Sequence, residues 1–358
     1  MAVNQLTSLG LTALRNNFSE LKNPYKLTFA ITYWCQSRCL TCNIWDIRPK
    51  GELTLDEIKN FASKNNFFKW IEITGGEPFL RSDIVDIVRT FHKNNKDLYL
   101  VTMPTNSLCN REMVLGKIKE MLDIGIPKLS ITVSLDGYKE LHDKIRGIPG
   151  NFEKAVSMFK DLQELSKQYK NLFFVFGYTV SPFNQGSFST TYSEVKKLIP
   201  NIRYNDFHFN IGQISGSYYR NESMTLSINK DIVAEEIKTL IKNRKFELGA
   251  IPIIETVFLK RLVDYVLTGK PQIKSRSLDA SLFMDSFGNV YPSIMWDKKI
   301  GNIRESDFYL KKMWYNQTAK EIRKEIKSGN EPSNWTACEA YQSIAGNVAE
   351  SLLTMFSK

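Results

Sequence analysis

The sequence contains no run of about 18 or more apolar residues, the length that a membrane-spanning helix needs. Its first residues, MAVNQLTSLGLTALRNNF, lack the charged segment followed by an apolar segment that is typical of a secretory signal. Only three histidines and five cysteines occur in 358 residues. An odd number of cysteines in a large chain without a signal argues against a disulfide framework. We therefore expect a cytoplasmic protein with no membrane span.

The chain also lacks a concentrated basic segment, although 48 Lys and Arg against 38 Asp and Glu give a net charge of +10. The surplus is spread along the sequence, and the stretch Lys320–Lys327 (KEIRKEIK) has the spacing of a solvated helix face. Such a distribution favours a general attraction of anions over a dedicated nucleic-acid arm. We therefore expect no nucleic-acid partner.

Short apolar segments alternate with helical periodicity from Lys26 onward, and this alternation predicts a parallel α/β sheet. The predicted strands are 26–34, 69–74, 97–103, 129–135, 172–181 and 203–211. The predicted helices between them are 54–66, 82–94, 111–124, 151–169 and 190–199. Thr54 and Glu57 have the spacing of a capping box at the start of the first of these helices. Right-handed crossovers would curl six such strands into a partial (β/α)6 barrel with helices outside.

The alternation stops near residue 225, where two helical stretches, 229–243 and 253–267, lead to a basic linker. A hairpin-like segment, SLFMDSFGNVYPSI, follows with its turn at Phe287–Asn289, and an amphipathic helix is predicted near 338–356. We therefore divide the chain into an N-terminal extension, a partial barrel, a helical connector and a small C-terminal α+β domain, at 1–25, 26–225, 226–276 and 277–358.

Three cysteines lie within eight residues directly after the first predicted strand, in the segment CQSRCLTC. Apolar core positions are not spaced in this way, and clustered thiols in a reducing compartment are typical of metal ligands. A structural zinc site needs four protein ligands, whereas an iron-sulfur cubane on Cys35, Cys39 and Cys42 leaves one iron open for a ligand. A zinc site remains open as the alternative, with its fourth ligand from the distant Cys109, Cys338, His92, His142 or His208.

Further motifs follow the ends of the next three predicted strands: Gly75–Pro78 (GGEP), Thr105–Ser107 and Ser134–Gly137 (SLDG). Because the carboxyl ends of parallel strands meet at one edge of a sheet, we expect these motifs to converge with the cysteines. Two adjacent glycines allow a backbone to approach a bound small molecule closely. A plain turn is the alternative interpretation of GGEP and of SLDG.

CxxxCxxC followed by GGEP resembles the radical S-adenosylmethionine superfamily, firmly over residues 26–215. SLDG and the HDKIRG of His142–Gly147 resemble the members of this family that carry a C-terminal SPASM or twitch domain. The resemblance implies one 4Fe-4S cluster on the three clustered cysteines, which cleaves S-adenosylmethionine reductively to methionine and a 5'-deoxyadenosyl radical. The radical would abstract hydrogen from a peptide or small-molecule substrate, with electrons from an external donor such as flavodoxin or ferredoxin.

The resemblance also implies which residues contact the cofactor, and it assigns no separate catalytic residue. The expected contacts are Gly75, Gly76, Glu77, Pro78, Asn106, Ser134, Asp136 and Arg146. GGEP is expected to bind the amino group of the methionine moiety, and Ser134 and Asp136 to bind its ribose or carboxylate. The planar guanidinium of Arg146 can grip a carboxylate in a bidentate pair, although a surface arginine is the alternative.

The C-terminal segment departs from the family pattern that it faintly resembles over residues 280–345. Ser293 stands where a cluster cysteine is expected, and Cys338 stands alone where a pair is expected. We therefore expect a degenerate SPASM/twitch-like domain without metal, which covers the open rim of the barrel. Cys338 and Cys109 are expected to be buried small residues, with a free thiol near the substrate as the alternative for Cys338.

Several further positions concern the binding of the cofactor and the substrate. Position 41, often aromatic in the family, is Thr41 here, with Trp34 and Trp45 nearby. Tyr218, Tyr219 and Arg220 are candidates for the substrate pocket, and an ordinary core cluster is the alternative interpretation of the aromatic residues. Two other functions remain open: a metal-stabilised binding scaffold without radical chemistry, and a non-radical S-adenosylmethionine-dependent transferase.

Overall fold

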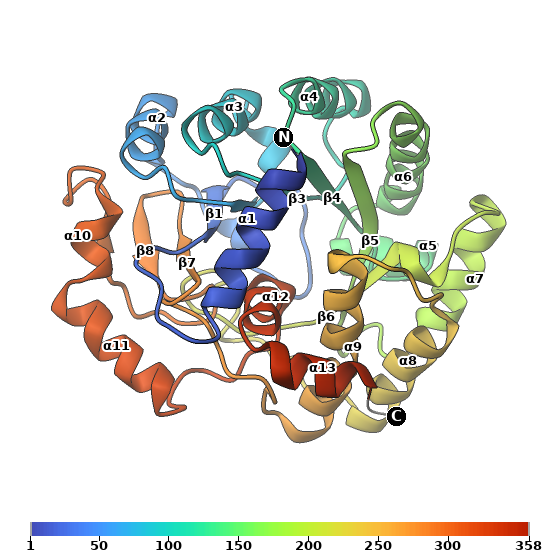
Figure 1. The fold of residues 1–358 in the computed structure, drawn as a ribbon. Coiled ribbons are helices and arrows are strands. Elements are labelled where there is room, and N and C mark those ends of the chain that lie inside the picture. Colours follow the sequence, from blue (N-terminus) through green and yellow to red (C-terminus); the bar gives the residue numbers. More distant parts are fainter. Residues whose placement is uncertain (1, 357–358) are drawn as a thin grey trace.

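The protein, a computed structural model that describes residues 2–356, is built on one open sheet of nine strands in the order β6-β5-β4-β3-β2-β1-β7-β8-β9 (Figure 1). The strands are β1 (Lys26–Thr32), β2 (Trp70–Gly75), β3 (Leu100–Thr105), β4 (Lys128–Ser134), β5 (Leu172–Val180), β6 (Phe207–Ile211), β7 (Ser281–Met284), β8 (Asn289–Tyr291) and β9 (Gly301–Asn302). β1 to β7 pair in parallel, and β8 and β9 are antiparallel additions at one edge. Because β6 and β9 are both edge strands, the sheet is not closed.

The helices follow the strands in chain order. They are α1 (Ala2–Arg15), α2 (Leu55–Lys64), α3 (Ile84–Asn94), α4 (Arg111–Asp123), α5 (Lys139–Arg146), α6 (Asn151–Gln168), α7 (Phe188–Leu198), α8 (Lys230–Asn243), α9 (Ala250–Thr268), α10 (Leu310–Trp314), α11 (Gln317–Lys327), α12 (Ala337–Ala345) and α13 (Val348–Phe356). Three short 3-10 helices are η1 (Ile44–Asp46), η2 (Pro78–Leu80) and η3 (Tyr204–Asp206). None of the described helices is long and apolar enough to cross a membrane.

The two faces of the sheet differ in polarity. The strands follow an arc, and α2, α3, α4 and α6 lie on its outer side (Figure 1). Ile71 and Ile73 of β2 point to this side and join the same buried core as Phe61 of α2. Successive side chains of a strand point to opposite faces of the sheet. Glu72 and Thr74 therefore point to the inner side, where they are only half-buried. The inner face at β2 therefore carries polar, half-buried side chains.

The sequence-based prediction of a partial barrel of alternating strands and helices is confirmed. The predicted capping box is present, since the amide of Glu57 donates to Thr54 Oγ1 at 3.3 Å and the amide of Thr54 donates to Glu57 Oε2 at 2.9 Å. β6 begins later than predicted, because residues 204–206 form η3 instead of extended strand. Helix α5 was not predicted, and it ends at Gly147, which has a φ of +70°.

The C-terminal segment continues the barrel sheet. Its predicted hairpin is present as β7 and β8, but β7 also pairs in parallel with β1, from Lys26 to Phe29. The strands β7 to β9 share one sheet with the barrel. The proposed domain boundary between residues 276 and 277 therefore stays a prediction. The single helix predicted over 338–356 is wrong. It is divided into α12 and α13, because Arg276 binds the carbonyl of Gly346 and Asn17 accepts from the amide of Val348 at 2.7 Å.

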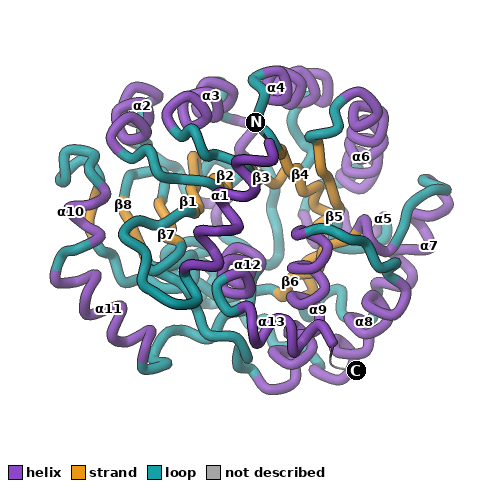
Figure 2. Tube along the Cα trace, viewed as in Figure 1, coloured by secondary structure: helices purple, strands orange, loops and turns teal. Residues whose placement is uncertain are grey.

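Helix α12 lies on the inner side of the arc, where it covers part of the polar face of the sheet (Figure 2). Its Tyr341 packs near Trp70 of β2, with ring centroids 6.3 Å apart, and near His208 of β6 at 6.0 Å. The residues of α12 therefore separate one end of the inner face from solvent, and the carboxyl ends of the strands remain for a site.

Candidate functional site

The three clustered cysteines lie in the loop that follows β1, and three other segments hold this loop. The amides of Arg38 and Leu40 donate to the carbonyls of Arg146 and Ile145 in α5, each at 2.9 Å. The amide of Asn43 donates to the carbonyl of Tyr219 at 2.9 Å. A third contact comes from the loop after β2, described below. The loop is thus fixed by hydrogen bonds to segments that are far away in sequence.

The cysteine thiols are half-buried and lie close enough to influence one another electrostatically. Burial raises the pKa of Cys35 to about 11, and burial also raises the pKa of Cys42. A bound metal reverses this preference, because coordination to a cation stabilises the thiolate. Within residues 2–356, no three His, Cys, Asp or Glu side chains converge on a single point. A cubane does not require such convergence, since its cysteines bind different irons.

The loop after β2 packs directly on the cysteine loop, and this packing explains its two glycines. Gly75 has a φ of +131°, and a Cβ there would lie 2.1 Å from the carbonyl oxygen of Thr32. A Cβ on Gly76 would lie 2.1 Å from the carbonyl oxygen of Trp34 and 3.0 Å from the Cβ of Cys35. The sequence interpretation that these glycines admit a ligand stays a prediction, and contact with the cysteine loop is a second reason for them.

Gly76→Ala is expected to destabilise the protein and to lower cluster uptake, because the added methyl group clashes with backbone that cannot move independently. The matched control is Gly116→Ala in α4, where a Cβ meets no atom within 4 Å and alanine favours the helix by about 0.5–1 kcal/mol. Thermal unfolding and iron content after reconstitution measure both effects. Equal behaviour of the two variants would contradict this role of Gly76.

Glu77 links the loops after β2 and β3. Its Oε2 accepts from the amide of Asn106 at 2.7 Å, and its Oε1 accepts from the amide of Phe79 at 3.3 Å. Burial raises the pKa of Glu77 to about 7, against the opposing effect of these hydrogen bonds. The Nδ2 of Asn106 in turn lies 3.7 Å from Cys35 Sγ. Glu77 thus positions Asn106 against a cysteine, while its predicted contact with the cofactor stays a prediction.

Asp136 and Arg146, both predicted to bind the ligand, bind each other in this structure. Arg146 Nε lies 2.7 Å from Asp136 Oδ2, and the two side chains are 14% and 5% exposed. Arg146 also places its NH1 3.7 Å from Cys39 Sγ. Ser134 ends β4 as a half-buried residue at the same edge. The structure therefore brings the predicted residues to one rim, while their contacts with a ligand stay predictions.

The contacts that two site residues make had no signal in the sequence. Tyr218, considered only as a pocket candidate, is buried and its hydroxyl oxygen accepts from the amide of Gly75 at 3.1 Å. The same hydroxyl lies 2.6 Å from Thr74 Oγ1. Glu52 accepts from the amide of Tyr33 at 2.7 Å, which fixes the first turn of the cysteine loop. Both act through contacts between distant segments, so no local pattern could identify them.

Three of the candidates for a fourth zinc ligand, Cys338, His208 and Cys109, have partners of their own. Cys338 Sγ donates to Glu72 Oε1 at 3.0 Å in the interior, and burial raises its pKa. His208 pairs with Glu255 at 3.0 Å. Cys109 comes nearest to the cysteine loop, where its sulfur accepts from Gln36 Nε2 at 3.2 Å.

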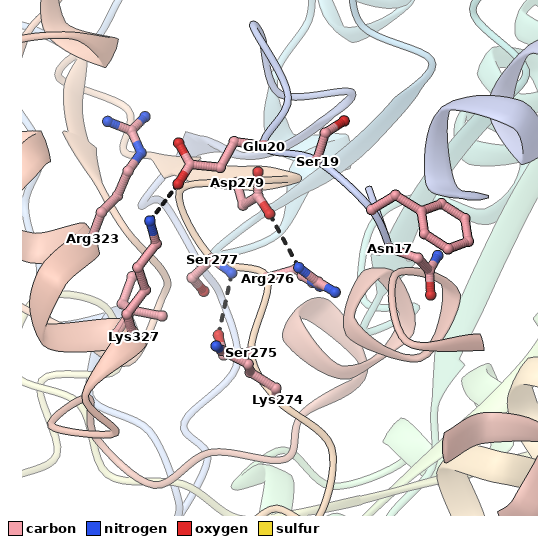
Figure 3. Close-up of a pocket in the computed structure, with 12 residues that line it drawn as sticks. Asn17, Ser19, Glu20, Lys274, Ser275, Arg276, Ser277, Asp279, Arg323 and Lys327 are labelled. Carbon is pink, nitrogen blue, oxygen red and sulfur yellow. Dashed lines mark hydrogen bonds and ion pairs between the residues drawn. The ribbon is translucent and has the colours of Figure 1, made fainter. Parts of the chain in front are cut away.

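A surface pocket of about 230 Å³ lies away from this site (Figure 3). Ser275, Arg276 and Asp279 precede β7, and Lys327 comes from α11. They lie at the opposite end of the parallel strands from the cysteine loop, which follows β1. Figure 3 shows their charges already paired, Lys327 with Glu20 and Arg276 with Asp279. Two of its charged side chains are thus engaged in ion pairs, and we take the cysteine rim as the candidate site.

Comparison with known proteins identifies relatives of the barrel. A sequence profile of the Radical SAM superfamily matches residues 29–185, which include the cysteine loop and all the other rim motifs. The AdoMet-dependent heme synthase of Methanosarcina barkeri is 31% identical over 180 residues, which cover 49% of this chain and 48% of that protein. The chain spans about half the length of the curated relatives it matches.

Solved structures match over more of the chain. A structure of anSMEcpe with bound AdoMet and Kp18Cys peptide has a TM-score of 0.58 at 18% identity, covering 93% of this chain and 96% of that chain. Streptococcus suis SuiB bound to precursor peptide SuiA has a TM-score of 0.56 at 17% identity, covering 89% and 71%. At these identities the likeness is one of fold.

Proposed function

Because residues 29–185 match the Radical SAM superfamily, we propose that the chain is a member of this family and an enzyme that cleaves S-adenosylmethionine reductively at a 4Fe-4S cluster held by Cys35, Cys39 and Cys42. The observation that carries this proposal is the attachment of the cysteine loop to the segments that follow β2, β3 and β4. Four motifs that are separate in sequence thereby act as one rim, where ligands of α/β barrels bind.

The residues of the rim fit such a cluster. They offer three thiols within one fixed loop, and two of these sulfurs have a hydrogen-bond donor 3.7 Å away, from Asn106 and from Arg146. Iron-sulfur sites usually have hydrogen-bond donors close to the sulfur atoms that hold the cluster. When bound, the cluster supplies the electron that splits the sulfonium of S-adenosylmethionine into methionine and a 5'-deoxyadenosyl radical.

The chain's own groups would orient S-adenosylmethionine. The amides of Gly76 and Glu77 already donate to the carbonyls of Thr32 and Trp34, each at 2.8 Å. The carbonyls of Gly75, Glu77 and Pro78 accept from the Tyr218 hydroxyl and from the amides of Leu80 and Arg81. We therefore propose the carbonyl of Gly76 as the acceptor for the protonated amino group, which needs such an acceptor. Ser134 lies half-buried at the end of β4 and is proposed to bind the ribose or carboxylate.

The substrate is proposed to occupy the inner face of the sheet. Glu72, Thr74 and Thr102 are half-buried on this face, so it can form hydrogen bonds to a polar molecule. Both anSMEcpe and SuiB hold peptides in the structures named above, so a peptide is the first substrate class to test, with a polar small molecule second. We place the reaction in the cytoplasm, with flavodoxin or ferredoxin as the electron donor.

Metal content tests the proposal against a zinc-stabilised scaffold. Anaerobic reconstitution with iron and sulfide is expected to give a brown protein with one cubane per chain, because only one loop supplies clustered thiols. A colourless protein that retains zinc and takes up no iron would contradict the proposal.

Cys338→Ala is expected to leave iron content and cofactor cleavage nearly unchanged, because its thiol is bonded to Glu72 and belongs to a C-terminal segment that we propose to be a degenerate SPASM/twitch-like domain. The buried Ser293 in that segment accepts from the amide of Met295 at 3.2 Å, as a structural residue does. Iron analysis and product detection check the variant. Loss of either would assign a metal or redox role to this domain.

A further inference from the structure

Arg146 occupies an unusual place for a charged side chain, directly against one of the clustered cysteines. It is the last residue of α5, its side chain is 14% exposed, and its NH1 points to Cys39 Sγ at 3.7 Å. The opposite side of the guanidinium binds Asp136 at 2.7 Å through Nε. The guanidinium of Arg146 therefore bridges the carboxylate of Asp136 and the sulfur of Cys39.

The backbone holds this arrangement. The carbonyls of Ile145 and Arg146 accept from the amides of Leu40 and Arg38, on either side of Cys39. The next residue, Gly147, has a φ of +70°, and a Cβ there would lie 2.5 Å from the carbonyl oxygen of Arg38. The end of α5 and the cysteine loop are thus packed as one unit, and the distance from the guanidinium to the sulfur is fixed by main-chain contacts.

Asp136 is fixed in the same manner. Its Oδ1 accepts from the amide of Thr179 at 2.9 Å, and its own amide donates to Nδ1 of His142 at 2.9 Å. Only Oδ2 of Asp136 remains for Arg146, and this contact orients the guanidinium. A guanidinium is always protonated in proteins, so a permanent positive charge stands beside Cys39.

We propose that Arg146, oriented by Asp136, is a positioning residue that tunes the reduction potential of the cluster through a charge-assisted hydrogen bond to Cys39. The inference rests on the proposed function, since it requires a cluster on this loop. Hydrogen bonds to ligand sulfurs and the local net charge set the potentials of iron-sulfur clusters. A cation at the sulfur stabilises the more negative, reduced state and so raises the midpoint potential.

The test is a redox titration of the full-length, anaerobically reconstituted protein without S-adenosylmethionine, followed by electron paramagnetic resonance. Arg146→Gln removes the positive charge and is expected to shift the midpoint to a lower potential. Asp136→Asn removes the compensating negative charge and is expected to shift it to a higher potential. The matched control is Arg111→Gln, which breaks an ion pair with Asp161 elsewhere on the surface and is expected to cause no shift.

Shifts of the midpoint potential in opposite directions distinguish an electrostatic effect of Arg146 on the cluster from a structural role. Two variants that merely loosen the loop would shift the midpoint potential in the same direction. Shifts of the same sign, or no shift in either variant at full iron content, would overturn the inference. Should Arg146→Gln fail to retain iron, the upward shift in Asp136→Asn still decides. A wild-type protein that forms no cluster would refute the proposed function itself, which is a distinguishable result.

Discussion

The variant that carries Cys35→Ala, Cys39→Ala and Cys42→Ala together is expected to take up no cluster, whereas the wild-type protein is expected to bind about four irons per chain. These are the three thiols in the loop after β1, and each alanine removes one proposed ligand. Iron and sulfide analysis with visible absorption measures the difference.

Cys109→Ala is the matched control for this experiment, because Cys109 accepts a hydrogen bond from Gln36 of the same loop and is not part of the cysteine motif. It is expected to retain full iron. Iron bound by the triple variant would mean that other residues hold the metal. About eight irons in the wild type would show a second cluster, which our interpretation of Ser293 and Cys338 denies.

Lys26→Met is expected to lower the free energy of unfolding by about 3–5 kcal/mol, the range found when one partner of a buried ion pair is removed. Lys26 is fully buried in β1, and its Nζ lies 2.6 Å from Glu72 Oε2 and 4.0 Å from the centre of the Trp70 ring. The same ammonium also donates to Gln342 Oε1 at 3.1 Å. Its loss leaves a carboxylate on the inner face without a counter-charge.

Chemical denaturation of the cluster-free protein measures this effect. The matched control is Lys59→Met, which removes a pair with Asp56 whose side chains are 52% and 90% exposed, and it is expected to cost less than about 1 kcal/mol. Adding Glu72→Gln to Lys26→Met is expected to recover part of the stability, since the uncompensated charge is then removed. Equal losses in Lys26→Met and Lys59→Met would contradict the account of this pair.

The alternation of strands and helices was predictable because its signals are local. Period-two and helical spacing, and the capping box at Thr54, depend only on residues a few positions apart. The cysteine spacing and GGEP are local as well, so the rim was identified from the sequence. Helix α5 was missed because it has only eight residues and lies between Gly137 and Gly147, which is typical of a loop.

The contacts that hold the site were not predictable, because each joins segments far apart in the chain. A lysine at the start of a strand is usually exposed, and Lys26 is buried only because Glu72 comes from the next strand and Gln342 from α12. Asp136 and Arg146 were each assigned to a ligand, and nothing in the sequence indicates that they pair with each other.

The most direct test of the central claim is whether the reconstituted protein, reduced with dithionite and supplied with S-adenosylmethionine alone, forms 5'-deoxyadenosine. The loop of Cys35, Cys39 and Cys42 and the adjoining Gly75–Pro78 suffice for cleavage in our account, so we predict slow formation of 5'-deoxyadenosine and methionine. The triple cysteine variant is predicted to form none. A wild-type protein with a full cluster and bound S-adenosylmethionine that releases no 5'-deoxyadenosine would contradict the assignment of radical chemistry.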